Sequence, residues 1–269
     1  MNGQMHSNML GNLANTTSKA RKRTRVLTLL CGWIPLSIGV RIRNLIYRTI
    51  VRKMGHCVNI QTDVTISDGT GIEFADYVSI SQGSILEASH HDQVVLGEHV
   101  FIDRDVRISS GKCGGRIHLQ AGVSLDRGVD IKTHHHGQTV IGKNTYIGPY
   151  TCLSGYGNIT IGSNCLIASH TSLYAHNYNF DNPKKLIREQ GYSHVGITIG
   201  DNCWIGSGVR IVDGVKIGDN SIVGAGAVVA RDIPPNSVAV GVPAKVVRVR
   251  SQQAITQRNF VAEVAEVMR

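Results

Sequence analysis

ITIGDNCWIGSGVRIVDGVKIGDNSIVGAGAVV, residues 197–229, decides the fold because its aliphatic side chains recur at every sixth position. The repeating residues are Ile199, Ile205, Ile211, Ile217, Val223 and Val229. An amphipathic helix would space them three or four residues apart, and a half-buried strand two apart. A period of six instead indicates short strands joined by tight corners, with one inward aliphatic residue on each side. Three such sides close a turn, so the sequence predicts a parallel β-helix.

The same spacing continues towards the N-terminus, with corners that bulge by a few residues. It begins near Val58 and runs through the triplets Phe74/Ile80/Leu86, Leu96/Ile102/Ile108, Leu119/Leu125/Ile131, Ile141/Ile147/Leu153 and Ile161/Ile167/Leu173. About nine turns fit, stacked roughly 4.8 Å apart. Thirty glycines and an aromatic content of only 5% agree with many corners around a thin aliphatic core.

One long polar segment, residues 174–196, interrupts the repeat, and loops of this length inside a compact array are usually functional. The remaining segments follow from composition and periodicity. We expect a disordered basic tail at 1–24, a basic amphipathic helical cap at 25–56, the β-helix at 57–245, and a C-terminal tail at 246–269 with a short helix.

The charge is concentrated at the N-terminal end. The net charge is +9, yet residues 1–55 hold ten of the 28 Lys and Arg residues and no acidic residue. This segment favours an anionic membrane surface over nucleic acid, because it lacks interleaved aromatic stacking groups. The apolar run 26–40 is too short to span a bilayer and Pro35 interrupts it. A helix that only caps the solenoid is the alternative, and both roles are compatible.

The six cysteines contain no CxxC pair. Cys165 and Cys203 each stand two residues before an inward aliphatic residue, at positions where other repeats carry Thr145 and Ser221. We therefore expect small core residues in a reducing compartment. This indicates a cytoplasmic protein that can rest peripherally on the inner face of a membrane.

Three motifs resemble the hexapeptide-repeat acyltransferases, and most closely the sugar O-acetyltransferases of capsule, exopolysaccharide and lipopolysaccharide synthesis. The motifs are AHNYNFDNPKKLIREQG at 175–191, the repeat and its continuation at 197–248, and LSIGVRIRNLIYR at 36–48. The resemblance implies a left-handed β-helix that assembles as a homotrimer. It also implies that acetyl-CoA and the acceptor lie in clefts between neighbouring solenoids.

His176 matches the catalytic histidine of that family. A neutral imidazole suits proton removal from a sugar hydroxyl near pH 7 as the hydroxyl attacks a thioester. Asp181, Glu189 or a backbone carbonyl could orient the ring. A backbone N–H near Ser207 or Gly208 could stabilise the oxyanion.

The resemblance also assigns a path for the donor. It places Ser207 and Ala225 along the pantetheine arm, and Trp204 at the wall of the acyl channel. The cations that would pair with the phosphates are Arg231, Lys245 and Arg248.

The acceptor side departs from the galactoside-type pattern. Gly148 stands where those enzymes carry an asparagine, and residues 1–55 offer no acid to hold the sugar. We therefore expect a glycan precursor or a nucleotide- or lipid-linked sugar rather than a free galactoside.

Other functions remain open at this point. An amino-sugar N-acetyltransferase or a xenobiotic acetyltransferase would share the fold and the donor. A γ-type carbonic anhydrase would need three His ligands to zinc, and the chain has twelve histidines, including His90-His91 and His134 to His136. Adjacent residues on a strand point to opposite faces, so no metal is expected. A non-catalytic docking solenoid is the non-enzyme alternative.

Overall fold

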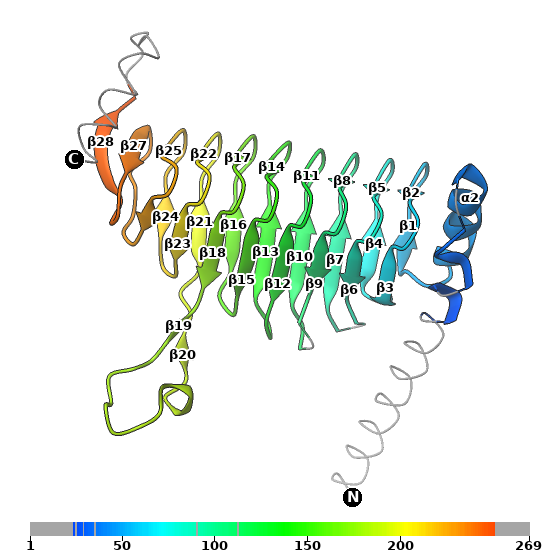
Figure 1. The fold of residues 1–269 in the computed structure, drawn as a ribbon, viewed down its shortest axis with the longest axis horizontal. Coiled ribbons are helices and arrows are strands. Elements are labelled where there is room, and N and C mark those ends of the chain that lie inside the picture. The colour runs from blue at the N-terminus through cyan, green and yellow to red at the C-terminus, as the bar shows by residue number, and fades with distance from the viewer. Residues whose placement is uncertain are drawn as a thin grey trace, which may run out of the picture.

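A computed structural model describes residues 24–250 except 25, 29, 35, 90 and 112. The predicted tail before Thr24 and the predicted helix at 251–268 lie outside the described residues. The described chain forms one elongated solenoid of stacked turns (Figure 1). The predicted parallel β-helix is therefore confirmed.

Each turn of the solenoid contributes one short strand to each of three parallel sheets, which we name A, B and C. Sheet A contains β1 (Lys53–Met54), β4 (Ile72–Phe74), β7 (Gln93–Leu96), β10 (Arg116–Leu119), β13 (Gln138–Ile141), β16 (Ile159–Ile161), β21 (Ile197–Ile199) and β24 (Lys216–Ile217). Sheet B contains β2 (Asn59–Ile60), β5 (Ser79–Ile80), β8 (Phe101–Ile102), β11 (Ser124–Leu125), β14 (Tyr146–Ile147), β17 (Leu166–Ile167), β22 (Trp204–Ile205), β25 (Ile222–Val223), β27 (Ser237–Val240) and β28 (Lys245–Val249). Sheet C contains β3 (Thr65–Asp68), β6 (Ile85–Glu87), β9 (Arg107–Ser109), β12 (Asp130–Thr133), β15 (Cys152–Gly155), β18 (Ser172–Ala175), β23 (Arg210–Val212) and β26 (Val228–Val229).

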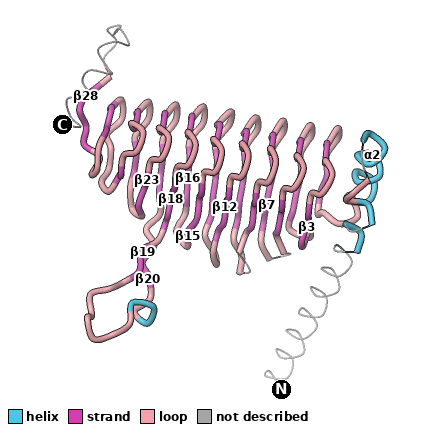
Figure 2. The backbone as a smooth tube through the Cα atoms, viewed as in Figure 1, coloured by secondary structure: helices cyan, strands magenta, loops and turns pink. Residues whose placement is uncertain are grey.

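Sheets A and C have eight strands each within the described residues, which gives about eight turns. A ninth parallel strand, β27, extends sheet B, and β28 folds back antiparallel on it. The prediction of about nine turns is thus close. The arrangement agrees with the left-handed β-helix that the resemblance implies (Figure 2).

The core is the column of residues that the six-residue period selects. Ile199, Ile205 and Ile217 are at most 1% exposed, and each stacks on its counterpart one turn away. Cys165 and Cys203 are buried beside this column, and the Cys203 N–H donates to Cys165 Sγ at 3.5 Å. Their predicted role as small core residues is confirmed. Burial of one large aliphatic side chain contributes about 1.5–3 kcal/mol, so the repeated column accounts for most of the stability.

The corners explain the glycine and asparagine content. At the corner from sheet A to sheet B, Asn144, Asn164 and Asn220 have positive φ values of 55°, 57° and 59°. At the corner from sheet B to sheet C, Gly208 and Gly226 take this conformation, each with a φ of 72°. Asparagine and glycine tolerate this left-handed conformation better than other residues.

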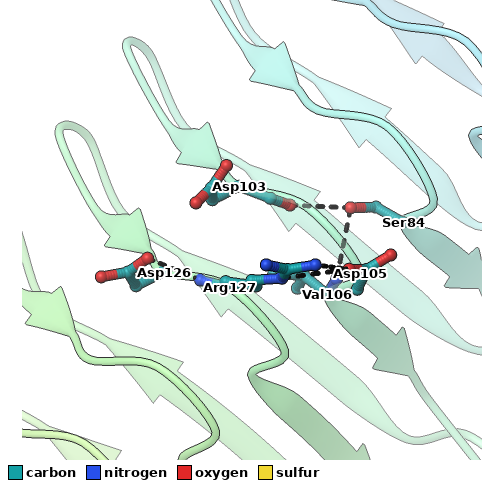
Figure 3. A network of polar contacts seen from close by, with 6 residues as sticks. All are labelled: Ser84, Asp103, Asp105, Val106, Asp126 and Arg127. Carbon is teal, nitrogen blue, oxygen red and sulfur yellow. Dashed lines mark hydrogen bonds and ion pairs between the residues drawn. The ribbon is translucent and has the colours of Figure 1, made fainter.

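Side chains also link neighbouring corners (Figure 3). Ser84 Oγ donates to the Asp103 carbonyl at 2.8 Å, which joins two successive turns. One turn further on, Arg127 forms an ion pair with Asp105 at 3.2 Å. Both partners of this pair are about half exposed, so the contacts fix corner geometry more than they add stability.

Helix α2 (Leu36–Tyr47) covers the N-terminal end of the solenoid (Figure 1). Its packed face is not simply its apolar face, because Ile38 and Leu45 are 66% and 74% exposed. Arg43 and Tyr47 are buried instead. Arg43 donates to the carbonyl of Ile60 at 2.9 Å and to three carbonyls that precede α2. A buried guanidinium thus supplies the donors that the end of the solenoid requires.

The C-terminal end of the described chain is a strand hairpin. β28 pairs antiparallel with β27, so that Lys245 lies opposite Val240 and Arg248 opposite Val238. The residue limits proposed above for the cap, the β-helix and the tail stay predictions.

Candidate functional site

The inserted segment leaves the solenoid after β18 and returns at β21 as a protruding arm (Figure 1). Its two limbs pair as the antiparallel strands β19 (Asn177–Tyr178) and β20 (Tyr192–Ser193), and a short 3-10 helix, η1 (Ile187–Glu189), lies between them. Gln190 holds the tip together, because its side-chain amide donates to the carbonyls of Asn182 and Lys185 at 3.0 and 3.1 Å. The arm is therefore an ordered hairpin.

The base of this arm is fixed to the next turn. The Asp213 carboxylate accepts hydrogen bonds from the backbone N–H groups of Val195, at 2.8 Å, and Gly196, at 2.7 Å. The returning limb is thereby held against the corner that follows β23. The outgoing limb starts directly beyond β18, where His176 lies.

His176 is the first residue after β18 and is half-buried. Its Nδ1 atom is buried and has no hydrogen-bond partner among the described residues. Asp181 and Glu189, both exposed, therefore do not orient the ring, and neither does a backbone carbonyl.

Tyrosine rings surround the His176 imidazole. The ring centroid of Tyr156 lies 5.5 Å away with the planes at 82°, and that of Tyr178 lies 6.0 Å away at 78°. Tyr174 makes a similar edge contact at 6.4 Å. These edge-to-face contacts restrict the ring and exclude water from one side of it.

Tyr156 belongs to a larger aromatic cluster that the sequence reasoning did not identify. Its ring stacks on Tyr192 of the arm at 4.1 Å, and on His134 and His135 of an earlier turn at 4.6 and 5.3 Å. His134 and His135 follow β12 and Tyr156 follows β15, both at the corner from sheet C to sheet A, whereas Tyr192 lies on β20 of the arm. The six-residue period predicts that His134, His135 and Tyr156 lie at the same kind of corner. It does not predict that their rings stack across successive turns.

Two hollows open along this corner. One, of about 420 Å³, is lined by His135, His136, Gly137, Tyr156, Gly157, Asn158, Tyr192, His194 and Val195. The other, of about 450 Å³, is lined by Glu87, Arg107, Ser109, Ser110, Gly111, Cys113, Lys132, Thr133, His134 and His135. Because His135 lines both, the two hollows adjoin.

The electrostatics of this corner favour a neutral histidine. Burial lowers the pKa of His134, and the positive charge of Lys132 lowers it further, with smaller contributions from His176 and His135. At neutral pH His134 is therefore an uncharged stacking surface rather than a cation.

The predicted donor residues lie on another part of the surface. Ser207 and Ala225 occupy successive corners between sheets B and C, and the Gly226 N–H donates to the Ser207 carbonyl at 2.8 Å. Ser207 Oγ lies 2.8 Å from Ser169 Oγ on the turn before. A Cβ added to Gly226 would meet no atom within 4 Å, so this strip of small residues faces open space.

Trp204 stands on β22, three residues before Ser207, and is 49% exposed. Lys245 and Arg248 lie on β28 of the same sheet, whereas Arg231 lies at the corner after β26, on the same corner row as His176. One chain thus brings Trp204, Ser207 and Ala225 near one another but separates Arg231 from the other two cations.

The Gly208 N–H already donates to the Ser169 carbonyl at 2.9 Å, so it is not free to stabilise an oxyanion. In the part of the chain that the structure describes, no group of three or more His, Cys, Asp or Glu side chains is placed to hold a metal ion.

Part of the repeat is similar to known proteins. The family model "Bacterial transferase hexapeptide (six repeats)" matches residues 196–231. A candidate acetyltransferase of Saccharomyces cerevisiae is 40% identical over 103 residues, which are 38% of this chain and 51% of that protein. The galactoside O-acetyltransferase of Escherichia coli is 44% identical over 91 residues, 34% of this chain and 43% of that enzyme. The predicted resemblance to hexapeptide-repeat transferases is confirmed, over about half the length or less of these relatives.

Among solved structures, the N-acyltransferase AntD of Bacillus cereus aligns with a TM-score of 0.47 at 18% identity. The alignment covers 84% of this chain and 95% of that one.

Proposed function

We propose that this hexapeptide-repeat protein transfers an acetyl group from acetyl-CoA to a hydroxyl of a sugar, with His176 as the general base. The observation that carries the proposal is the place of His176, half-buried at the base of the inserted arm between edge-on tyrosine rings. The similarity to a galactoside O-acetyltransferase supports the same class of reaction.

The chemistry needs one proton acceptor. In this mechanism Nε2 of His176 takes the hydroxyl proton as the sugar oxygen attacks the thioester carbonyl carbon. The carbon–sulfur bond then breaks, and the imidazolium returns its proton to the leaving thiolate. The products are an acetyl ester and the CoA thiol. General-base catalysis of this kind contributes typically about 10²–10⁴-fold.

The donor is proposed to lie along the strip of small residues at Ser207 and Ala225. A side chain larger than alanine on this strip would obstruct a pantetheine arm lying against the turns. Trp204 would wall the acyl end. Arg231, Lys245 and Arg248 would pair with phosphates, and the separation of Arg231 from the other two within one chain fits a cleft built from two copies.

Self-association as a homotrimer is part of the proposal. On the outer face of sheet B, Phe101, Leu166 and Trp204 are 43%, 54% and 49% exposed. The registers of β8, β11, β14, β17 and β22 align these side chains in one column along the solenoid. Ser124 and Tyr146 stand between Phe101 and Leu166 in this column. Exposed apolar side chains that recur along one face are typical of a surface that packs on another subunit.

A membrane role for the cap is also proposed. Leu30, Trp33, Ile38 and Leu45 are each more than 60% exposed, beside the exposed cation Arg41. Apolar side chains flanked by arginine suit the interface of an anionic bilayer. Among the described residues, no helix is both long enough and apolar enough to cross a membrane. The proposed location is the cytoplasmic side of a membrane, at a lipid-linked glycan.

The test is thiol release from acetyl-CoA in the presence of a panel of sugars, nucleotide sugars and lipid-linked glycans. Acceptor-dependent release, with a product that mild base deacetylates, supports an O-acetyltransferase. A base-resistant product would show the amide of an amino-sugar N-acetyltransferase instead. Absence of acetyl-CoA binding in calorimetry would overturn the acyltransferase proposal.

A further inference from the structure

The two adjoining hollows lie along the corner between sheets C and A and share His135, and together we call them the corner groove. One end of the corner groove is at Glu87, at the end of β6 in the second turn. The other end is at Tyr192 on the inserted arm. Figure 1 shows the arm leaving from β18 at the edge where β9, β12 and β15 also end. Since turns repeat at about 4.8 Å, a groove over five turns extends roughly 19 Å. This is long enough for several sugar rings, with His176 beside one end.

The two ends of the corner groove differ in chemistry. Near His176 it presents the Tyr156 and Tyr192 rings, which suit the apolar faces of sugar rings. Further away it presents Arg107 and Lys132, both exposed and without an ion pair among the described residues. Glu87 is the only carboxylate that lines the described part of this end. The far end therefore carries a net positive charge.

A buried hydroxyl at the far end lacks a partner. Ser110 lines the groove, is only 4% exposed, and its Oγ makes no hydrogen bond within the described residues. The neighbouring Ser109 differs, because its Oγ donates to Glu87 at 3.3 Å. Buried hydroxyls are normally paired, so an unpaired one in a groove wall indicates a place that a ligand's polar group fills.

We propose that the corner groove binds an acidic glycan chain, and that its carboxylates meet Lys132 and Arg107 while a terminal or internal residue reaches His176. This inference rests on the proposed function for the identity of the reaction. It adds that the acceptor is a chain rather than a single sugar, and that the residues flanking the reacting sugar carry carboxylates. The Ser110 hydroxyl donates to the same chain.

The test measures binding and not catalysis, so it stands apart from the proposed function. Two acidic hexamers are titrated into the full chain by calorimetry: hexagalacturonate, and a hyaluronan hexasaccharide in which uronic acid alternates with N-acetylglucosamine. Galacturonate monomer and uncharged maltohexaose are the comparisons. We expect at least one hexamer to bind at least tenfold more tightly than either comparison. We expect binding to weaken with salt, as charge attraction requires.

Variants locate the binding. Lys132→Gln should weaken hexamer binding about tenfold, as expected for loss of one charge-assisted hydrogen bond. Ser110→Ala should weaken it severalfold, because it removes the unpaired hydroxyl. Lys216→Gln is the matched control: Lys216 is an exposed lysine on β24 of sheet A, away from the corner groove. It should leave binding unchanged.

Two results would overturn the proposal: hexamers that bind no more tightly than the monomer or maltohexaose, or equal losses in Lys132→Gln and Lys216→Gln. Hexamer binding that persists in His176→Ala supports the groove even where thiol release fails. Thiol release without chain binding would leave the acyltransferase standing and refute the groove.

Discussion

The Asp213 carboxylate accepts a hydrogen bond from the backbone N–H of Gly196 at 2.7 Å, which ties the inserted arm to the turn that follows it. A second bond, from the Val195 N–H, makes the carboxylate a clamp on the returning limb. Because His176 starts the outgoing limb, the position of the proposed base depends on this clamp.

Replacing the clamp should loosen the arm without unfolding the solenoid. In Asp213→Asn the acceptor loses its charge, and one bond to a charged group contributes about 1.5–3 kcal/mol. We expect faster hydrogen exchange in residues 177–195 and a lower kcat than in the wild type. The Tm should stay within a few degrees of the wild-type value. Asp219→Asn is the control, since Asp219 accepts the Asp201 N–H at 2.8 Å at a corner away from the arm. Equal exchange in both variants would show that Asp213 has no special role.

The outer column of sheet B gives a prediction about assembly. Leu166→Glu places a charge between Tyr146 and Trp204 in this outer column, and burying an unpaired carboxylate between subunits is costly. We expect the variant to sediment as a monomer with an intact circular dichroism spectrum. Glu substituted for Leu186, an exposed leucine of the arm tip, tests whether the arm contributes too. A Leu166→Glu variant that sediments with the wild type would refute assembly through sheet B.

Membrane attachment is testable without deleting the cap. Deletion of α2 would remove the buried Arg43 and Tyr47, whose side chains donate to the carbonyls of Ile60 and Val64 at the end of the solenoid, so point variants are preferable. Leu45→Asp, at an exposed apolar position of α2, should reduce sedimentation with phosphatidylglycerol vesicles severalfold. Leu186→Asp on the arm is the matched control. Equal vesicle binding by wild type and Leu45→Asp would contradict the proposal.

The pKa of His134 predicts a pH dependence with a definite sign. Burial and the charge of Lys132 lower this pKa in the folded chain, so the unfolded chain binds the proton more tightly. The contribution of His134 to stability is therefore complete above pH 6.5 and declines as the pH falls through and below that value. In NMR titrations, His134 should titrate below 6.5, and Lys132→Gln should raise its pKa. An unchanged value in Lys132→Gln would show that the lysine charge does not reach the ring.

The period of six predicted much of this fold. It selects the buried column, such as Ile205 and Ile217, because each inward side chain must fill the same narrow core. It also marked 174–196 as an interruption of the repeat, and the structure shows that this segment is a hairpin arm. The packed face of α2 was not predictable in this way, because Arg43 is buried by hydrogen bonds to carbonyls of the solenoid end that no helical pattern records.

The candidate site was predicted less completely. His176 was identified by its motif, and the structure supplies its surroundings. The stacking of Tyr156 on His134 joins residues 22 positions apart. Because bulged corners change the number of residues in each turn, the sequence alone does not show that these two positions are neighbours. The buried Nδ1 of His176, which has no hydrogen-bond partner among the described residues, was also not predicted. The sequence analysis had named Asp181, Glu189 or a backbone carbonyl as the group that orients the ring.

The most direct measurement is acceptor-dependent acetyl transfer by wild type and His176→Ala, with acetyl-CoA binding measured in both. Loss of a general base should lower kcat about 10²–10⁴-fold while acetyl-CoA binding stays within a factor of two. His118→Ala, at an exposed histidine on β10 of sheet A, should retain activity. Transfer at the wild-type rate in His176→Ala would contradict the account.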